Sequence, residues 1–192
     1  NGAFVNIGQE KNGFLYLTDV VAPQSADEPA GPMKIIKKIF GRGEKKDNAE
    51  QKAIPLKQGQ EILVQVVKEP FSTKGARLTS HISLAGRFVV YMPYDTHGGV
   101  SKKIESHDER QRLRGLLDGF DFAKTWGFIV RTASHEKGNH ELTRDARFLY
   151  KIWQEILRKA ETKQAPALIY KEYDLIWKIV RERALARDGN RC

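Results

Sequence analysis

Alternating apolar and polar positions predict two short strands at the start of the chain. Aliphatic side chains occupy every second position in residues 3–7 and again at the end of residues 12–17, which is the pattern of strands with one buried face. The glycine and polar residues at positions 8–12 indicate a turn between them. We therefore expect an antiparallel pair with Phe4 and Phe14 on its more polar face, where packing alone would favour hydrophilic side chains.

Residues 22–60 are predicted to form a long basic loop, because four prolines stand there among glycines, acidic residues and many lysines. A short helix is expected inside it at residues 34–40. Two further strands, residues 61–69 and 75–83, are joined by a turn at residues 70–74. Short strands with long connections are typical of a small Greek-key barrel.

After about residue 86 the pattern changes to mixed helices and strands, so the expected fold class is α+β. The expected strands cover residues 87–92, 126–132 and 167–170, and the expected helices begin after Ser106, cover residues 139–162 and cover residues 173–186. The helix over residues 139–162 has the strongest pattern, since its apolar residues recur at spacings of three and four.

The helix after Ser106 carries a recognisable start signal. Ser106 stands at the N-cap and Glu109 three residues into the helix, the arrangement called a capping box, in which each side chain bonds the other residue's backbone N–H. Leu113, Leu116 and Leu117 follow on one side. The box predicts where the helix begins, and the leucines predict which face is buried.

Composition and charge indicate a globular chain with a polyanionic partner. The 192 residues include 33 Lys and Arg against 24 Asp and Glu, a formal net charge of +9, which favours nucleic acid as a partner. No apolar run reaches the roughly 18 to 20 residues needed to span a bilayer. The single cysteine, Cys192, excludes an internal disulfide and a cysteine-based zinc site within this chain, and a reducing compartment is expected.

Phe4, Phe14 and Lys74 are the first candidate constellation. Two aromatic rings on the outer face of a small barrel, with a basic residue on an adjoining turn, are typical of the platforms on which single-stranded bases stack. The alternative is that both rings pack beneath the basic loop. The sequence alone leaves both interpretations open.

Arg131 and Thr132 form the second constellation, at the end of an apolar strand. A guanidinium can hold a phosphate through two parallel N–H donors, and a threonine hydroxyl adds a third. The alternative is an ordinary surface ion pair of Arg131 with Glu136 or Asp145. Spacing alone favours the ion pair.

The remaining polar motifs are less specific. Lys102, Lys103 and the lysines of the basic loop could follow a nucleic-acid backbone, although most such runs are only a solvated face. The five histidines are scattered and carry no metal-ligand spacing, so no metal is assigned to them. No set of residues in the sequence forms a complete active site.

With these residues in view, the chain resembles the bacterial ribonuclease E/G family along essentially its whole length. The most specific segments are Ser83-Leu84-Ala85-Gly86, Gly98-Gly99 and Arg131-Thr132-Ala133. Further resembling stretches are residues 3–8, 13–15, 74–76, 82–86, 92–93, 98–101 and 165–166, in the family's order and separation.

The resemblance implies three parts. Residues 1–80 look like an RNA-binding OB barrel of the ribosomal-protein S-one type, lacking its first strand or strands, with the basic loop at residues 22–60. Residues 81–176 resemble a mixed α/β subdomain that senses the 5′ end of RNA. Residues 177–192 resemble the start of a ribonuclease-H-like subdomain. Because the chain begins inside a strand pattern and breaks off just after a helical pattern, we expect an internal fragment of a longer protein.

The resemblance also implies roles for individual residues. Carried onto this sequence, the RNA contacts of the barrel are Phe4, Phe14 and Lys74, and the 5′-monophosphate sensor consists of Gly86, Val90, Arg131 and Thr132. Arg131 and Thr132 would contact phosphate oxygens, while Gly86 and Val90 would shape the cradle for the terminal nucleotide. Such a pocket would prefer monophosphate ends to the bulkier triphosphate.

Members of this family are endoribonucleases that cut single-stranded, A/U-rich RNA in the cytoplasm during mRNA decay and rRNA and tRNA maturation. The implied cofactors are Mg²⁺, held by aspartates beyond Cys192, and Zn²⁺ at a protomer interface, also with ligands outside this chain. The parent protein would then be a homo-oligomer with degradosome-type protein partners. This fragment is expected to bind RNA without cutting it.

Three departures from the family pattern are visible. The insertion around residues 33–50 is longer and more basic than in the shortest family members, and the sequence assigns it no role. Ile7 stands where many relatives carry a tyrosine, and Lys102 and Lys103 replace an arginine pair, which keeps the charge but loses bidentate geometry. The main alternative function is a noncatalytic RNA-binding protein of translation or RNP assembly. A structural interaction module with incidental charge is a third.

Overall fold

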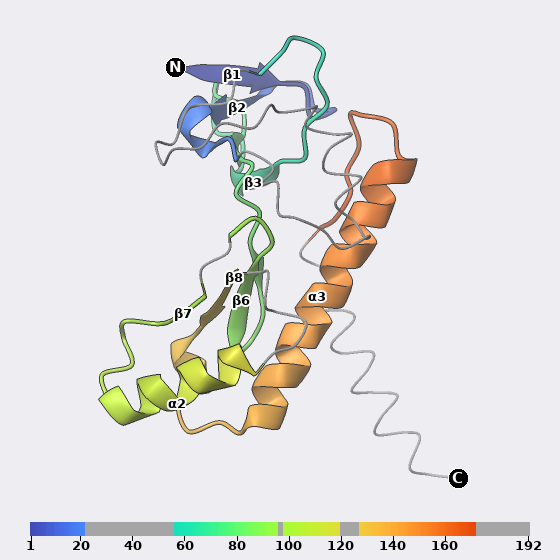
Figure 1. Ribbon diagram of the computed structural model, residues 1–192. Helices are drawn as coiled ribbons and strands as arrows, with labels where there is room; N and C mark the ends of the chain where they lie inside the picture. The colour runs from blue at the N-terminus through green and yellow to red at the C-terminus, as the bar shows by residue number, and fades with distance from the viewer. Residues whose placement is uncertain (22–55, 96–97, 120–126, 172–192) are drawn as a thin grey trace, which may run out of the picture.

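The computed structural model describes residues 1–21, 56–95, 98–119 and 127–171 (Figure 1). The predicted helices at residues 34–40 and 173–186, most of the basic loop and the segment resembling a ribonuclease-H-like subdomain lie outside these ranges. The described residues form two small sheets and two helices, which is the predicted α+β class. One sheet holds the N-terminus, and the other packs against the long helix α3.

The first sheet contains four strands in the order β1 (Gly2–Val5), β2 (Gly13–Tyr16), β4 (Arg77–Thr79) and β3 (Gln65–Lys68). β1 pairs with β2 antiparallel, β2 with β4 parallel, and β4 with β3 antiparallel. The hairpin predicted from the alternation is thus confirmed. A short 3₁₀ helix, Leu17–Asp19, follows β2.

Both later strands of this sheet are shorter than predicted, because side chains replace the ladder at their ends. The Gln65 side-chain amide donates to the Ser83 carbonyl (3.0 Å) and its oxygen accepts from the Ser83 N–H (2.9 Å). The buried Ser80 hydroxyl accepts from the Val21 N–H (2.7 Å) and donates to the Asp19 carbonyl (2.9 Å). These bonds satisfy backbone groups that a longer strand pair would have used.

The described strands do not close into a barrel. The order β1-β2-β4-β3 leaves β1 and β3 as free edges. The inner face has a small buried cluster of Leu15, Val20, Ala76 and Leu78, while the opposite face carries the exposed Phe4. Phe4 therefore lies on the solvent side, as the alternation predicts.

The second sheet has the order β5 (Leu84–Ala85), β6 (Val89–Met92), β8 (Gly127–Val130) and β7 (Gly99–Val100). The pairs β5–β6 and β6–β8 are antiparallel, and β7–β8 is parallel. The strands expected at residues 87–92 and 126–132 are confirmed with slightly shorter bounds. The rings of Tyr91 and Phe128 stack in the core with centroids 4.6 Å apart.

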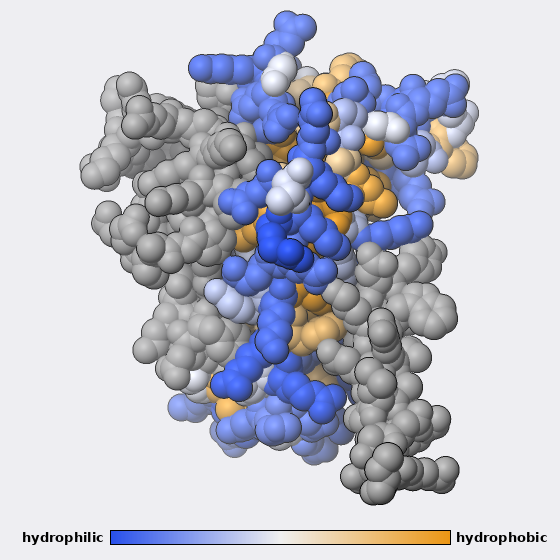
Figure 2. Space-filling view, turned by 90° about the vertical axis from the view of Figure 1, so that its right-hand side faces the viewer, coloured by the Kyte–Doolittle hydropathy of each residue, from blue (hydrophilic) through white to orange (hydrophobic). Residues whose placement is uncertain are grey.

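Helix α3 (Asn139–Thr162) has the predicted bounds and lies along one side of the molecule (Figure 1). Its apolar stripe is buried and consists of Leu142, Ala146, Leu149, Ile152, Trp153, Ile156 and Leu157. Figure 2 shows hydrophilic side chains along the side of the molecule on which α3 lies. Burying one stripe while hydrating the other explains why the helix is stable beside the sheet.

Helix α2 (His107–Asp118) begins at the predicted N-cap, where the Ser106 hydroxyl accepts from the Glu109 N–H (3.3 Å). The second bond of the predicted capping box, from the Ser106 N–H to the Glu109 carboxylate, is not formed, so this part of the prediction is wrong. The Glu109 carboxylate instead accepts from the Arg112 guanidinium (2.6 and 2.7 Å) and from the Glu136 N–H (3.0 Å). A stronger, charge-assisted partner has taken the carboxylate away from the cap.

The strand predicted at residues 167–170 is also wrong. This segment has no regular secondary structure and no ladder partner among the described residues. Its Ile169 and Tyr170 pack partly against the core beside α3, so their apolar pattern reflects burial without strand pairing. Neither described helix is long and apolar enough to cross a membrane.

Candidate nucleic-acid interface

Phe4 and Phe14 face each other across β1 and β2 as direct register partners. Their ring centroids are 5.4 Å apart and the ring planes meet at 66°, an edge-to-face contact. Phe4 is 76% exposed. The ring of Phe14 lies across Gly2, where any Cβ atom would overlap it. Glycine at that position is therefore what lets the second ring lie flat against the sheet.

The exposure of Phe4 shows that this ring is not part of the described core, and most of the basic loop, beneath which both rings were alternatively expected to pack, lies outside the described residues. Phe14 is only half-buried, and the rings of Phe4 and Tyr16 are its aromatic neighbours. Exposing a large apolar ring loses the roughly 1.5 to 3 kcal/mol that its burial would provide. An exposed aromatic cluster on a sheet face indicates a binding surface.

Lys74 lies on a tight turn that contacts the β1–β2 turn. The turn is closed by paired backbone bonds between Phe71 and Lys74 (2.9 and 3.1 Å). It is fastened to the β1–β2 turn, since the Lys11 ammonium donates to the Ser72 carbonyl (2.7 Å) and Gly75 touches the Asn12 carbonyl. The structure thus places Lys74 at the end of the hairpin that carries both phenylalanines.

Sequence reasoning did not select Tyr16 and Arg77, which extend this aromatic cluster. The Tyr16 ring is 4.8 Å from that of Phe14 at 90°, and the Arg77 guanidinium lies 5.0 Å from the Tyr16 centroid. Tyr16 stands two positions after Phe14 in the same strand and so shares its face. That period of two was the available signal for Tyr16, whereas Arg77 required the pairing of β2 with β4.

The second constellation forms where β8 ends beside the β5–β6 turn. The Arg131 N–H donates to the Phe88 carbonyl (2.8 Å), and its guanidinium donates to the Gly86 carbonyl. Val90 is the register partner of both Ala85 and Ile129, so it lies one step from Gly86 along the sheet. Gly86 and Arg131, each directly after the end of its strand, therefore lie on either side of β6, which carries Val90.

Thr132 completes the predicted set, because it follows Arg131 and opens a short 3₁₀ helix, Thr132–Ser134, with an exposed side chain. The ion pairs considered for Arg131 are not formed with Glu136 or Asp145. Asp145 is instead turned toward backbone amides. The guanidinium is exposed and keeps donors available for a ligand.

Two residues to which the sequence assigned no such role, Asp145 and Ser134, hold the turn beneath Arg131. The Asp145 carboxylate, on α3, accepts from the N–H groups of Phe88 (2.7 Å) and Val89 (3.1 Å). The buried Ser134 hydroxyl donates to the Phe88 carbonyl (2.6 Å). A Cβ atom on Gly86 would lie 2.5 Å from Asp145, so glycine there permits the carboxylate to approach.

Lys102 and Lys103 lie close to the same end of the second sheet. The Ser101 N–H donates to the Val130 carbonyl (2.9 Å), which sets the turn containing both lysines beside Arg131. Both lysine side chains are exposed. The lysines thus add positive charge at the edge that carries the guanidinium.

The ionisable groups of the described residues show no arrangement for catalysis. Burial raises the pKa of Tyr91 and of Tyr94 far above the ordinary value, so both phenols stay neutral in the core. No group of three His, Cys, Asp or Glu side chains in the described ranges is placed to hold a metal ion. What the surface offers is stacking, hydrogen bonding and positive charge.

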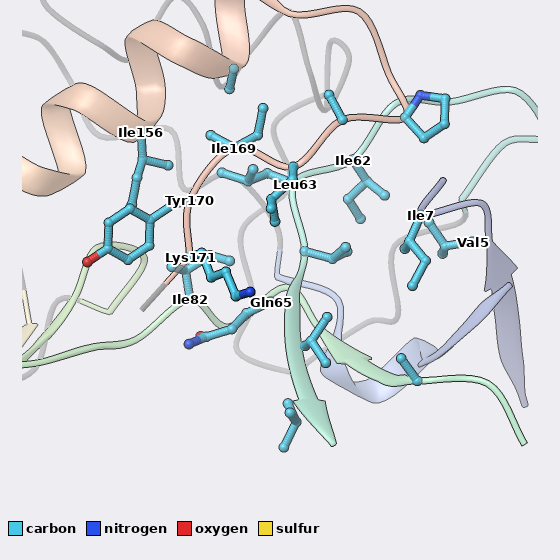
Figure 3. A pocket seen from close by; sticks show the side chains of 18 of the residues that line it. Val5, Ile7, Ile62, Leu63, Gln65, Ile82, Ile156, Ile169, Tyr170 and Lys171 are labelled. Atoms are coloured by element: carbon cyan, nitrogen blue, oxygen red, sulfur yellow. The ribbon is translucent and has the colours of Figure 1, made fainter. Parts of the chain in front are cut away.

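A groove of about 960 Å³ lies between the free edges of the first sheet and the end of α3. Figure 3 shows Val5 and Ile7 on one side of it and Ile62 opposite, with Ile156 from α3 farther along. Its lining is mostly aliphatic. The groove therefore differs in chemistry from the aromatic and basic surface described above.

The sheet, the exposed rings and the arginine at the strand end occur here in a chain that belongs to the ribonuclease E/G family. The family model described as "Ribonuclease E/G family" matches residues 83–188. This match covers the second sheet, both described helices and the Arg131 constellation.

Individual relatives extend the likeness over nearly the whole chain. Ribonuclease G of Haemophilus influenzae is 39% identical over 181 residues, and Ribonuclease G of Escherichia coli strain K12 is 35% identical over 182 residues. Ribonuclease E of a Nostoc species is 37% identical over 183 residues. These alignments cover 94%, 95% and 95% of this chain but 34%, 35% and 24% of the relatives, so the chain spans between about a quarter and about a third of their length.

Proposed function

We propose that this chain is the RNA-binding part of an endoribonuclease that cleaves single-stranded, A/U-rich RNA in the cytoplasm. The reactions it would serve are mRNA decay and the maturation of rRNA and tRNA. The observation that carries the proposal is the exposed Phe4 ring, held edge to face with Phe14 beside the turn of Lys74. Bases of any kind stack on such rings, and lysine neutralises the adjoining phosphate.

The first sheet would be part of an OB barrel closed by one further strand. β1 and β3 run in the same direction, since each is antiparallel to β2 or to its parallel neighbour β4. A strand between their free edges could therefore pair antiparallel with both. The aliphatic groove between these edges, lined by Val5, Ile7 and Ile62, supports such an occupant, and the occupant would be a segment of the full-length protein.

The second sheet would sense the 5′ end of the RNA through Gly86, Val90, Arg131 and Thr132. A guanidinium has five N–H donors, and the Gly86 carbonyl uses one side of Arg131. The remaining donors, with the Thr132 hydroxyl, suit the oxygens of a terminal monophosphate. Lys102 and Lys103 would contact the backbone of the following nucleotides.

The cleavage chemistry would come from a subdomain of the full-length protein outside this chain. In the full-length protein we place Mg²⁺ in a further subdomain, where it would supply Lewis-acid activation of the phosphodiester and of water. Zinc-linked protomers of a homo-oligomer and degradosome-type partners would likewise use other residues. The contribution of the residues described here is to bind RNA and orient its leading end.

Binding of short RNA tests this proposal directly. A fluorescent A/U-rich oligoribonucleotide bearing a 5′-monophosphate is compared with the same oligomer bearing a 5′-hydroxyl, for the 192-residue chain and three variants. The double variant Phe4→Ala, Phe14→Ala is expected to bind both oligomers at least tenfold more weakly, because stacking contributes about 1 to 3 kcal/mol per base. Arg131→Ala is expected to abolish only the preference for the monophosphate.

The third variant, Arg144→Ala, removes an exposed arginine of α3 and controls for net charge. Unchanged affinity in the phenylalanine variant would overturn the stacking surface, and equal affinity of the wild type for both oligomers would overturn the sensor. The full-length protein then separates the main alternative, because a noncatalytic RNA-binding protein would leave the RNA intact in the presence of Mg²⁺.

A further inference from the structure

We propose that Tyr16 and Arg77 form a second nucleotide-binding station, next to the Phe4–Phe14 pair and on the same sheet face. This inference rests on the proposed RNA-binding function and extends it to residues with no assigned role. It implies that single-stranded RNA crosses the sheet from β1 toward β4 rather than contacting only the edge hairpin.

The strand register carries the argument. Phe4 pairs with Phe14 across β1 and β2, and Phe14 pairs with Arg77 across β2 and β4. Directly opposite residues of paired strands share a face, so the two rings and the guanidinium form one row across three strands. At about 4.8 Å between strands, the row offers a continuous track for several nucleotides.

Tyr16 links the row to a second position along β2. Its ring meets Phe14 at 4.8 Å and lies 5.0 Å from the Arg77 guanidinium, and it is 41% exposed. Phe14, Tyr16 and Arg77 therefore form an unbroken set of flat groups. A base can stack on a tyrosine ring or on a guanidinium plane, and the guanidinium can also meet the phosphate beside it.

The Arg77 guanidinium is held in position by an ion pair, while its N–H groups stay available to a ligand. Its closest acidic partner is Asp19 at 3.6 Å, and the two side chains are 47% and 29% exposed. That ion pair holds the guanidinium over the Tyr16 ring. Within the described residues the Arg77 guanidinium donates no side-chain hydrogen bond besides its ion pair with Asp19, which leaves its N–H groups available to a ligand.

The length of single strand that an OB fold binds also requires more than two aromatic rings. OB folds bind about 4 to 16 nucleotides of single strand each, whereas Phe4, Phe14 and Lys74 provide for one or two bases. Tyr16 and Arg77 supply the next stacking surface and the next phosphate contact. No other described aromatic residue touches the Phe14 ring on this face.

The test uses fluorescence anisotropy of a 5′-hydroxyl A/U-rich oligoribonucleotide, so that the sensor does not contribute, at several salt concentrations. Arg77→Ala is expected to weaken binding about fivefold or more and to lower the slope of log K against log salt by about 0.7, the value for one phosphate contact with a single strand. Arg77→Lys should keep the slope but lose affinity, because lysine has no plane for stacking. Tyr16→Ala should lower affinity without changing the slope.

Arg114→Ala, on the exposed side of α2 at the far end of the molecule (Figure 1), is the matched control. Equal affinities and slopes for Arg77→Ala and Arg114→Ala would overturn the second station. If the Phe4 and Phe14 variant still loses binding in that case, the proposed RNA-binding function stands and only this inference fails. Thermal melting of each variant identifies misfolding, and Arg77→Lys, which keeps the ion pair with Asp19, then decides the outcome.

Discussion

The carboxylate of Asp145 on α3 accepts a hydrogen bond of 2.7 Å from the backbone N–H of Phe88, 57 residues earlier in the chain. A second bond of 3.1 Å comes from Val89. The long helix thereby fixes the turn whose Gly86 carbonyl holds the Arg131 guanidinium. A residue that points away from the surface thus positions the group proposed to bind phosphate.

Replacing Asp145 by Ala is expected to lower the free energy of unfolding by about 2 to 3 kcal/mol, since two backbone donors lose a charged acceptor. The same change should reduce the preference for 5′-monophosphate, because the turn under Arg131 loses its anchor. Urea denaturation and the paired oligomers measure the two effects. Asp118→Ala, at an exposed position near the end of α2, is the control and should change neither.

Gly86→Ala tests the close approach in another way. The added Cβ would lie 2.5 Å from the Asp145 carboxylate, so the turn must shift, and we expect a loss of at least about 1 kcal/mol of stability. Gly115→Ala is the matched control. Its Cβ meets nothing within 4 Å on α2, and alanine in a helix should stabilise by about 0.5 to 1 kcal/mol. Similar effects of the two changes would contradict the packing at Gly86.

Acid should destabilise the fold through Glu109. The bonds from Arg112 and then from the Glu136 N–H lower the pKa of this carboxyl from 4.5 to about 2. Because the unfolded chain takes up the proton first, the contribution is fully present above about pH 4.5 and is lost as the pH falls toward 2. Melting temperatures between pH 2 and 6 should therefore fall less steeply for Glu109→Gln. The same change at the exposed Glu105 should leave the profile as it is in the wild type.

Because β1 and β3 are free edges, we expect the stability of the first sheet to increase when further residues of the full-length protein are present. Extending the gene product upstream of residue 1 should cover the groove beside Val5 and Ile7 and raise the free energy of unfolding by about 3 kcal/mol or more, at about 1.5 to 3 kcal/mol per buried aliphatic side chain. Uncovered edges also favour association between copies. Light scattering and urea denaturation of the two lengths measure both effects, and identical behaviour would contradict the closing strand.

The hydrophobic pattern within a segment predicted those helices and strands that one buried face defines. The spacing of apolar residues gave both ends of α3, and the alternation in residues 3–7 predicted that Phe4 faces solvent. For Arg131 the spacing favoured a surface ion pair, which is not formed, and only the family resemblance grouped it with Gly86, Val90 and Thr132. One sequence period was thus enough to define a helix or a strand face, but not this group of residues.

Contacts between distant segments could not be predicted in this way. The bonds of Asp145 to Phe88 and Val89, and of Gln65 to Ser83, depend on how the helix and sheets meet. Glu109 fits the capping-box pattern, yet a charged partner one turn along the helix outcompetes the cap. The apolar run at residues 167–170 is buried against α3 without a strand beside it, which a pattern of hydrophobicity cannot distinguish from a strand.

The bond from Lys11 to the Ser72 carbonyl and the contact of Gly75 with Asn12 have a thermodynamic consequence. They hold the backbone that carries Lys74 at a fixed separation from the hairpin of Phe4 and Phe14 in the protein without ligand. Ordering a mobile side chain on binding costs about 0.5 to 1.5 kcal/mol. In the RNA complex proposed above, the backbone beneath Lys74 is already ordered by folding, so the entropy lost by the protein on association would be mainly that of exposed side chains such as Lys74.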